Sequence, residues 1–109
     1  MEYTKVGQTT DILANTMTMV LVGGKEVLVA NVDGAYYAIS NKCSHLGGPL
    51  AQGKLEGGIV TCPRHGARYD VRTGEAVGEA KMGFLKMKVK DEPSYSVKVE
   101  GTDILVGVG

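Results

Sequence analysis

The candidate metal-binding residues of this 109-residue chain lie in two short stretches, Cys43-Ser44-His45-Leu46-Gly47-Gly48 and Cys62-Pro63-Arg64-His65-Gly66-Ala67-Arg68-Tyr69-Asp70. Both cysteines and both histidines of the chain fall within these stretches. Each stretch therefore supplies one thiolate and one imidazole, and no residue of either type is left over. Four such ligands in two loops indicate one metal site.

The order of the ligands, C-x-H-L-G followed by C-P-x-H-G-x-x-Tyr-Asp, resembles the Rieske iron–sulfur motif. The residues after the second stretch, Val71-Arg72-Thr73-Gly74-Glu75-Ala76, also look like the turn that follows it in Rieske ferredoxins. The resemblance implies a [2Fe–2S] cluster in which Cys43 and Cys62 bind one iron while His45 and His65 bind the other.

Two other interpretations of the four ligands remain open at this stage. Zinc also accepts two cysteines and two histidines, although zinc sites usually pair like ligands locally, whereas each stretch here mixes them. A disulfide between Cys43 and Cys62 would staple a small domain but would leave both histidines without a role. A Rieske cluster is the interpretation that uses all four residues.

Four further residues are predicted around the cluster because of the same resemblance. Leu46 and Pro63 are expected to shield it from water, and the Tyr69 hydroxyl is expected either to donate to a cysteine sulfur or to serve only in packing. Ala67 stands where high-potential Rieske proteins carry a serine. The additional cysteines of those proteins are absent as well, so a lower reduction potential is expected.

Composition narrows the classes of function. Twelve basic residues balance twelve acidic ones, so the chain lacks the strongly basic character that a nucleic-acid phosphate backbone would require. Its N-terminal residues do not resemble a signal peptide, and no apolar run reaches the length of a membrane span. These features lead us to expect a cytoplasmic protein without a membrane anchor.

Glycine-punctuated runs of alternating residues predict an all-β chain. Gly23-Gly24 and Asp33-Gly34 are hairpin turn signals between such runs, whereas residues 52–58 are predicted as a glycine-rich turn region. The predicted strands cover residues 16–22, 25–32, 35–39, 59–61, 85–90, 95–99 and 104–108.

A single Rieske domain spanning residues 1–109 is therefore predicted, and 43% hydrophobic content suffices for a modest core in a chain of this length. We expect an antiparallel β sandwich or barrel carrying a small cluster-binding subdomain at about residues 41–82, as the resemblance implies.

The chemistry that remains possible is electron transfer. With both histidines in the ligand set, none is left for a mononuclear iron or for nucleophilic catalysis, so the chain is not expected to be an enzyme by itself. It is predicted to carry single electrons from a nicotinamide-dependent reductase to a terminal oxygenase or a similar redox protein. The alternatives are the small subunit of an assimilatory nitrite reductase and a zinc-stabilised binding module without redox activity.

Overall fold

The computed structural model describes residues 2–42, 49–63, 66–77, 80–82, 85–87 and 91–108. Regular structure in these ranges is almost entirely β, and the helical part is a single 3-10 turn, η1 (Leu50–Gln52). Within the same ranges, no helix is long and apolar enough to cross a membrane.

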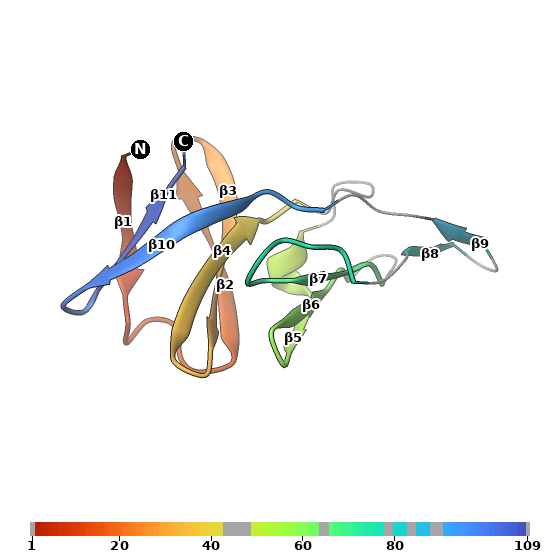
Figure 1. The fold of residues 1–109 in the computed structure, drawn as a ribbon, viewed down its shortest axis with the longest axis horizontal. Helices are drawn as coiled ribbons and strands as arrows, with labels where there is room; N and C mark the ends of the chain where they lie inside the picture. The colour runs from red at the N-terminus through yellow and green to blue at the C-terminus, as the bar shows by residue number, and fades with distance from the viewer. Residues whose placement is uncertain are drawn as a thin grey trace.

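Six antiparallel strands form one sheet that curls until its two outer strands contact each other (Figure 1). We call this sheet the barrel sheet. In spatial order its strands are β1 (Tyr3–Gln8), β11 (Asp103–Gly107), β10 (Ser94–Glu100), β4 (Ala35–Ser40), β3 (Lys25–Val32) and β2 (Thr16–Val22). The predicted all-β antiparallel barrel is confirmed.

Two tight turns set the register of β2, β3 and β4. Gly23 and Gly24 have φ of 57° and 81°, and Asp33 and Gly34 have φ of 52° and 95°. Positive φ at both central residues defines the turns whose twist matches that of antiparallel strands. The bounds predicted for β2 and β3 are the observed ones, and β4 is one residue longer than predicted.

Strand β3 is buried on both of its faces. Val27 and Val29 belong to the core inside the barrel sheet, whereas Leu28 and Ala30 belong to a second core on the other side of the strand. Side chains alternate between the two faces of a strand, so consecutive apolar residues are what a doubly buried strand needs. One strand is therefore a common wall between two hydrophobic cores.

The second core lies under a three-stranded sheet, which we call the small sheet. Its strands are β5 (Lys54–Glu56), β6 (Ile59–Thr61) and β7 (Arg68–Asp70). Leu55, Val60 and Tyr69 are register partners across the three strands, and they contribute to the second core.

The prediction that residues 52–58 form only a turn region is wrong for β5. Leu55 packs against the second core between two exposed residues, Lys54 and Glu56, and this alternation pairs the segment with β6. The turn is confined to Gly57-Gly58, which connects β5 to β6.

Beyond the small sheet, a two-stranded hairpin of β8 (Ala80–Met82) and β9 (Leu85–Met87) extends away from the rest of the chain (Figure 1). The predicted strand 85–90 begins with β9, whereas its residues 88–90 lie outside the described part. The strands predicted at 95–99 and 104–108 correspond to β10 and β11 within one residue at each end.

The segment before β10 is hydrogen-bonded to the turn that follows β7. The Glu92 amide donates to the Gly74 carbonyl at 2.7 Å, and the Ala76 amide donates to Asp91 Oδ1 at 2.8 Å. A Cβ at Gly74 would overlap the Glu92 carbonyl oxygen, so this close approach needs glycine. These contacts bind the small sheet to the chain that continues into the barrel sheet.

Candidate metal centre

Cys62 is the one predicted ligand that lies in the described ranges. It follows β6 directly, its residue is 2% exposed, and its thiol is free rather than part of a disulfide. The stretch 43–48, with Cys43, His45 and Leu46, and residues 64–65, with His65, lie outside the described part of the chain. Among the described residues there is accordingly no group of three or more metal-binding side chains.

The second stretch is closed by backbone hydrogen bonds at its two ends. The Cys62 amide donates to the Ala67 carbonyl at 2.7 Å, and the Gly66 amide donates to the Cys62 carbonyl at 3.3 Å. Gly66 has φ of 74°, a conformation that favours glycine. The second pair of predicted ligands thus belongs to one short closed loop between β6 and β7.

The first stretch is closed by Asn41, which is 2% exposed. Its carbonyl accepts from the Leu50 amide at 2.7 Å, and its Oδ1 accepts from the Ala51 amide at 2.8 Å. On the other side, its amide donates to the Glu26 carbonyl at 3.0 Å and its Nδ2 donates to Glu26 Oε1 at 3.2 Å. Asn41 therefore joins both ends of the first stretch to β3.

The residue segments that adjoin the two stretches meet at one place in the fold. Leu50, which follows the first stretch, and Cys62 belong to the same buried core. A Cβ at Gly53 would overlap the Thr61 carbonyl oxygen, so the backbone after the first stretch lies directly against the backbone before the second. This approach explains how cysteines far apart in sequence could serve one cluster.

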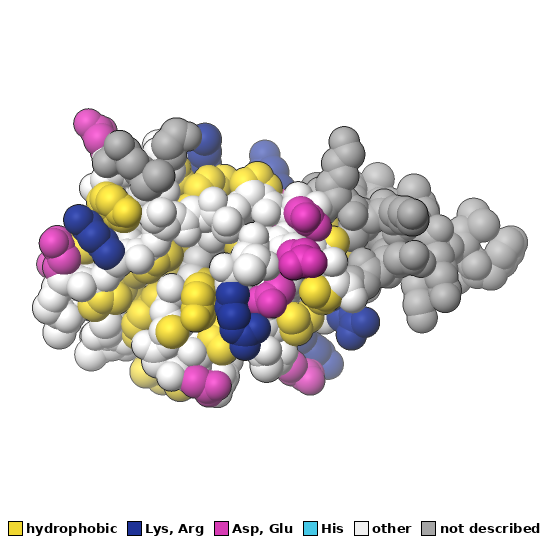
Figure 2. All heavy atoms as spheres, viewed as in Figure 1, with side chains coloured by type: hydrophobic (Ala, Val, Ile, Leu, Met, Phe, Trp, Pro, Cys, Tyr) yellow, Lys and Arg dark blue, Asp and Glu magenta, His cyan; other side chains and the backbone are white. Residues whose placement is uncertain are grey.

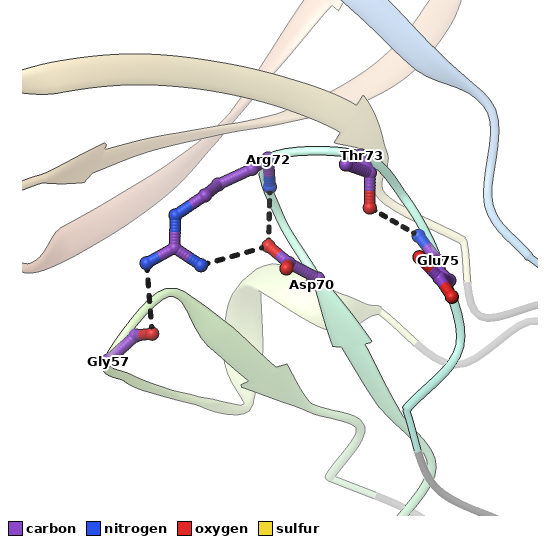
Figure 3. Close-up of polar contacts among 5 residues, drawn as sticks. All are labelled: Gly57, Asp70, Arg72, Thr73 and Glu75. Carbon is purple, nitrogen blue, oxygen red and sulfur yellow. Dashed lines mark hydrogen bonds and ion pairs between the residues drawn. The ribbon is translucent and has the colours of Figure 1, made fainter.

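The end of the small sheet away from Cys62 is held by Arg72 (Figure 3). Its guanidinium donates to Asp70 Oδ1 at 3.2 Å and to the Gly57 carbonyl at 3.3 Å, and the Arg72 amide donates to the same Asp70 oxygen at 2.9 Å. Nearby, the Glu75 amide donates to Thr73 Oγ1 at 3.1 Å. Arg72 thereby fixes the β5–β6 turn relative to the end of β7.

The residues predicted around the cluster have different surroundings. Ala67 and Tyr69 are fully buried in the core that contains Cys62, whereas Pro63 is exposed. Sequence reasoning missed Asn41 and Arg72. For Asn41 no local signal was present, because its side chain contacts Ala51 and Glu26, which are distant in the sequence.

The described surroundings of Cys62 fit an iron–sulfur cluster. A buried free thiol is available as a soft ligand, its loop is closed by hydrogen bonds, and apolar side chains limit the access of water. Among the described residues, Cys62 forms no disulfide.

Asn41→Ala should lower the free energy of unfolding and should also speed the release of the cluster. The change leaves the Ala51 amide and the Glu26 carboxylate without their side-chain partner, which we expect to cost about 2 kcal/mol in the free energy of unfolding. Release of iron to a chelator, followed by the loss of visible absorbance, should become several-fold faster.

The matched control is Asn31→Ala. Asn31 is also buried, but its Nδ2 donates to the Ile12 carbonyl and its Oδ1 accepts from the Gly34 amide, away from the small sheet. This variant should lose a similar amount of stability while iron release at a temperature well below unfolding stays unchanged. Equal release rates for the two variants would contradict a specific role of Asn41 in closing the ligand stretch.

Comparison with known families gives a match to the Rieske [2Fe-2S] domain over residues 2–88. The chain is 34% identical over 106 residues to the ferredoxin component of biphenyl 2,3-dioxygenase from Rhodococcus jostii, covering 97% of this chain and 92% of that protein. The fold is similar, with a TM-score of 0.87 and 32% identity over the full length of both chains, to the ferredoxin of carbazole 1,9a-dioxygenase from Nocardioides aromaticivorans. A structure described as a complex of reduced oxygenase and oxidized ferredoxin in carbazole 1,9a-dioxygenase matches with a TM-score of 0.81 and 25% identity, covering 96% of this chain and 92% of that one.

Proposed function

The chain belongs to the Rieske [2Fe-2S] family, and we propose that within it the protein serves as a ferredoxin that carries single electrons from a reductase to an oxygenase. The observation that carries this proposal is the match over nearly the whole chain to ferredoxin components of dioxygenase systems. Its cofactor is a [2Fe–2S] cluster, so the interpretation of the site as a zinc site is not retained. The nitrite reductase alternative has no comparable support among these relatives.

We assign the cluster to Cys43, His45, Cys62 and His65. The burial and free thiol of Cys62 support this ligand set, as does the closure of each stretch by Asn41 and by Ala67. When bound, the cluster accepts and releases one electron. The protein holds its ligands in two hydrogen-bonded loops and surrounds Cys62 with apolar side chains.

The protein is an electron carrier rather than a catalyst. The chain has two histidines, and both belong to the assigned ligand set, so none remains to bind a mononuclear iron. Two relatives that match over more than nine-tenths of both chains are likewise named as ferredoxins of dioxygenase systems.

The partners follow from the same relatives. One structural neighbour is described as a complex between a ferredoxin and its oxygenase, which supports a terminal oxygenase as the electron acceptor. A nicotinamide-dependent reductase is the matching donor. We propose that the protein works in the cytoplasm, where a reductase that oxidises a nicotinamide cofactor would act.

We further propose that residues 1–109 form one domain, with residues 41–82 as its cluster-binding part. The buried face of the small sheet supports a single domain, because it completes a core to which β3 of the barrel sheet contributes.

The test is the spectroscopy and redox stoichiometry of protein purified without oxygen. Iron and acid-labile sulfide should be present at about two each per chain. Electron paramagnetic resonance (EPR) of the dithionite-reduced protein should show an average g below the free-electron value, and reduction should consume one electron per cluster. Stoichiometric zinc with no visible absorbance would overturn both the cluster assignment and the carrier function.

Ala67→Ser should raise the reduction potential. Ala67 is buried beside Cys62, and a serine hydroxyl there could donate to the cluster, whose reduced state carries more negative charge. Protein-film voltammetry measures the change. The control is Ala30→Ser, which adds a hydroxyl to the same core from β3 and should leave the potential unchanged. A fall in potential for Ala67→Ser would contradict the expected donor.

Tyr69→Phe tests the role of the buried tyrosine in the same way. If its hydroxyl donates to a cysteine sulfur, removing it should lower the reduction potential, because that donor favours the more negative reduced cluster. An unchanged potential would make Tyr69 a packing residue only.

A further inference from the structure

A pocket of about 220 Å³ opens at the end of the barrel sheet where β2 turns into β3. Its residues come from the β2–β3 turn, from the start of β3, from the end of β4 and the residues after it, and from the start of β10. They are Gly24, Lys25, Glu26, Ser40, Lys42 and Tyr95. We call this feature the mouth pocket.

The mouth pocket lies at one end of the interior of the barrel sheet. Val27 and Ala38 belong to the core inside that sheet, and Tyr95 packs against the same core. Lys25 lies two residues before Val27, and Ser40 lies two residues after Ala38. Because side chains alternate between the two faces of a strand, Lys25 and Ser40 are on the same face as this core. The pocket is therefore the polar end of an otherwise apolar interior.

Two lysines lie opposite each other across the mouth pocket. The pairing of β3 with β4 continues beyond its last register partners, because the Asn41 amide donates to the Glu26 carbonyl at 3.0 Å. The next step along the two chain segments places Lys25 opposite Lys42, and both line the pocket. Like charges directly opposite each other on neighbouring strands are destabilising.

Among the described residues, neither lysine forms an ion pair within 4 Å. Glu26 also lines the pocket, but it follows Lys25 directly, so its side chain is on the other face of β3, where Oε1 accepts from Asn41 Nδ2. On the face shown in Figure 2, acidic side chains gather over the region of β7 and its following turn, away from the β2–β3 turn. Two positive charges thus share one small pocket without a carboxylate between them.

We propose that the mouth pocket binds a small oxyanion with two negative charges, of the size of inorganic phosphate, between the ammonium groups of Lys25 and Lys42. The anion accepts charge-assisted hydrogen bonds from both ammonium groups and offsets their mutual repulsion. The hydroxyl groups of Ser40 and Tyr95 are further donors among the pocket residues.

The bound anion also lowers the reduction potential of the cluster, a consequence that rests on the proposed carrier function. Lys42 directly precedes Cys43, an assigned cluster ligand. Reduction adds negative charge to the cluster, and a dianion held by Lys42 opposes that addition. Because coupling between two equilibria is reciprocal, reduction of the cluster weakens anion binding by the same factor.

The first experiment measures binding of inorganic phosphate to the oxidised protein by nuclear magnetic resonance (NMR) of the backbone amides. Phosphate replaces chloride at constant ionic strength and at about pH 8, where it is mainly a dianion. The amide signals of Gly24 and Tyr95 should shift and then saturate. In Lys25→Gln/Lys42→Gln the affinity should fall by about tenfold or more, because two charge-assisted hydrogen bonds are lost.

The matched control is Lys5→Gln/Lys98→Gln, which removes the same charge. These lysines are also neighbours across strands, since both are register partners of Leu105, but each forms an ion pair, Lys5 with Asp103 and Lys98 with Glu100. Phosphate affinity in this variant should stay within about twofold of the unsubstituted protein. An equal loss of affinity in the two variants, or shifts that grow without saturation, would overturn the site.

Voltammetry at increasing phosphate concentration tests the coupling to the cluster. The potential should fall in the unsubstituted protein and in the control variant, and it should stay constant in Lys25→Gln/Lys42→Gln. Saturable binding with an unchanged potential would overturn the coupling and leave the carrier function standing. Absence of a Rieske EPR signal from the reduced protein would instead overturn the carrier function, whereas the NMR titration tests the anion site without any electron transfer.

Discussion

Cys62→Ser should abolish the cluster. The thiol is buried at the end of β6, in a loop closed on itself by hydrogen bonds, and no other described thiol could take its place. A serine hydroxyl is a much poorer ligand for iron in such a site, because it rarely ionises near neutral pH. The purified variant should contain little iron, show no visible absorbance and give no EPR signal after reduction.

The loss should also lower stability, because a group that binds only the folded state stabilises it. Thr61→Ser is the control, since it changes the neighbouring residue, half-buried in the same strand, without touching a ligand. It should retain the iron content and the spectrum of the unsubstituted protein. Native iron content in Cys62→Ser would show that Cys62 does not bind the cluster.

Gly53→Ala should destabilise the fold strongly. The new Cβ would overlap the Thr61 carbonyl oxygen and would lie 3.2 Å from the Leu50 carbonyl oxygen, so backbone atoms would have to move. Overpacking of this kind costs about 3 kcal/mol, which corresponds to a fall of roughly 10 °C or more in Tm for a domain of this size. Chemical and thermal denaturation measure the change.

Gly57→Ala separates this overlap from the cost of backbone conformation. Gly57 has φ of 57°, but a Cβ there would meet no atom within 4 Å. The expected cost is about 1 kcal/mol, the strain of a non-glycine residue in the left-handed region. A similar loss of stability in both variants would contradict the close backbone approach at Gly53.

Local signals made the hairpins of the barrel sheet predictable. Gly23-Gly24 and Asp33-Gly34 are turn sequences with a backbone requirement of their own, so β2 and β3 could be placed to the residue. By contrast, β1 was not predicted. Its burial does not follow a simple alternation, and it is ordered by pairing with β11 at the other end of the chain.

The small sheet was only partly predictable for the same reason. Three residues of β5 carry one buried side chain, Leu55, which is too little to distinguish a strand from a turn. The proposed ligands could be selected from the sequence alone because two cysteines and two histidines fall in two motifs. The role of Asn41 depends on contacts with Glu26 on β3, and such long-range pairing cannot be read from spacing.

Because β3 contributes side chains to both hydrophobic cores, it couples the small sheet to the barrel sheet. Val29 faces one core and Leu28 and Ala30 face the other, so swinging the small sheet away from the barrel sheet would expose buried apolar surface. Opening a hinge between the two sheets would therefore be costly in free energy. Any motion that carries the cluster between partners must therefore move the barrel sheet and the small sheet together as one body.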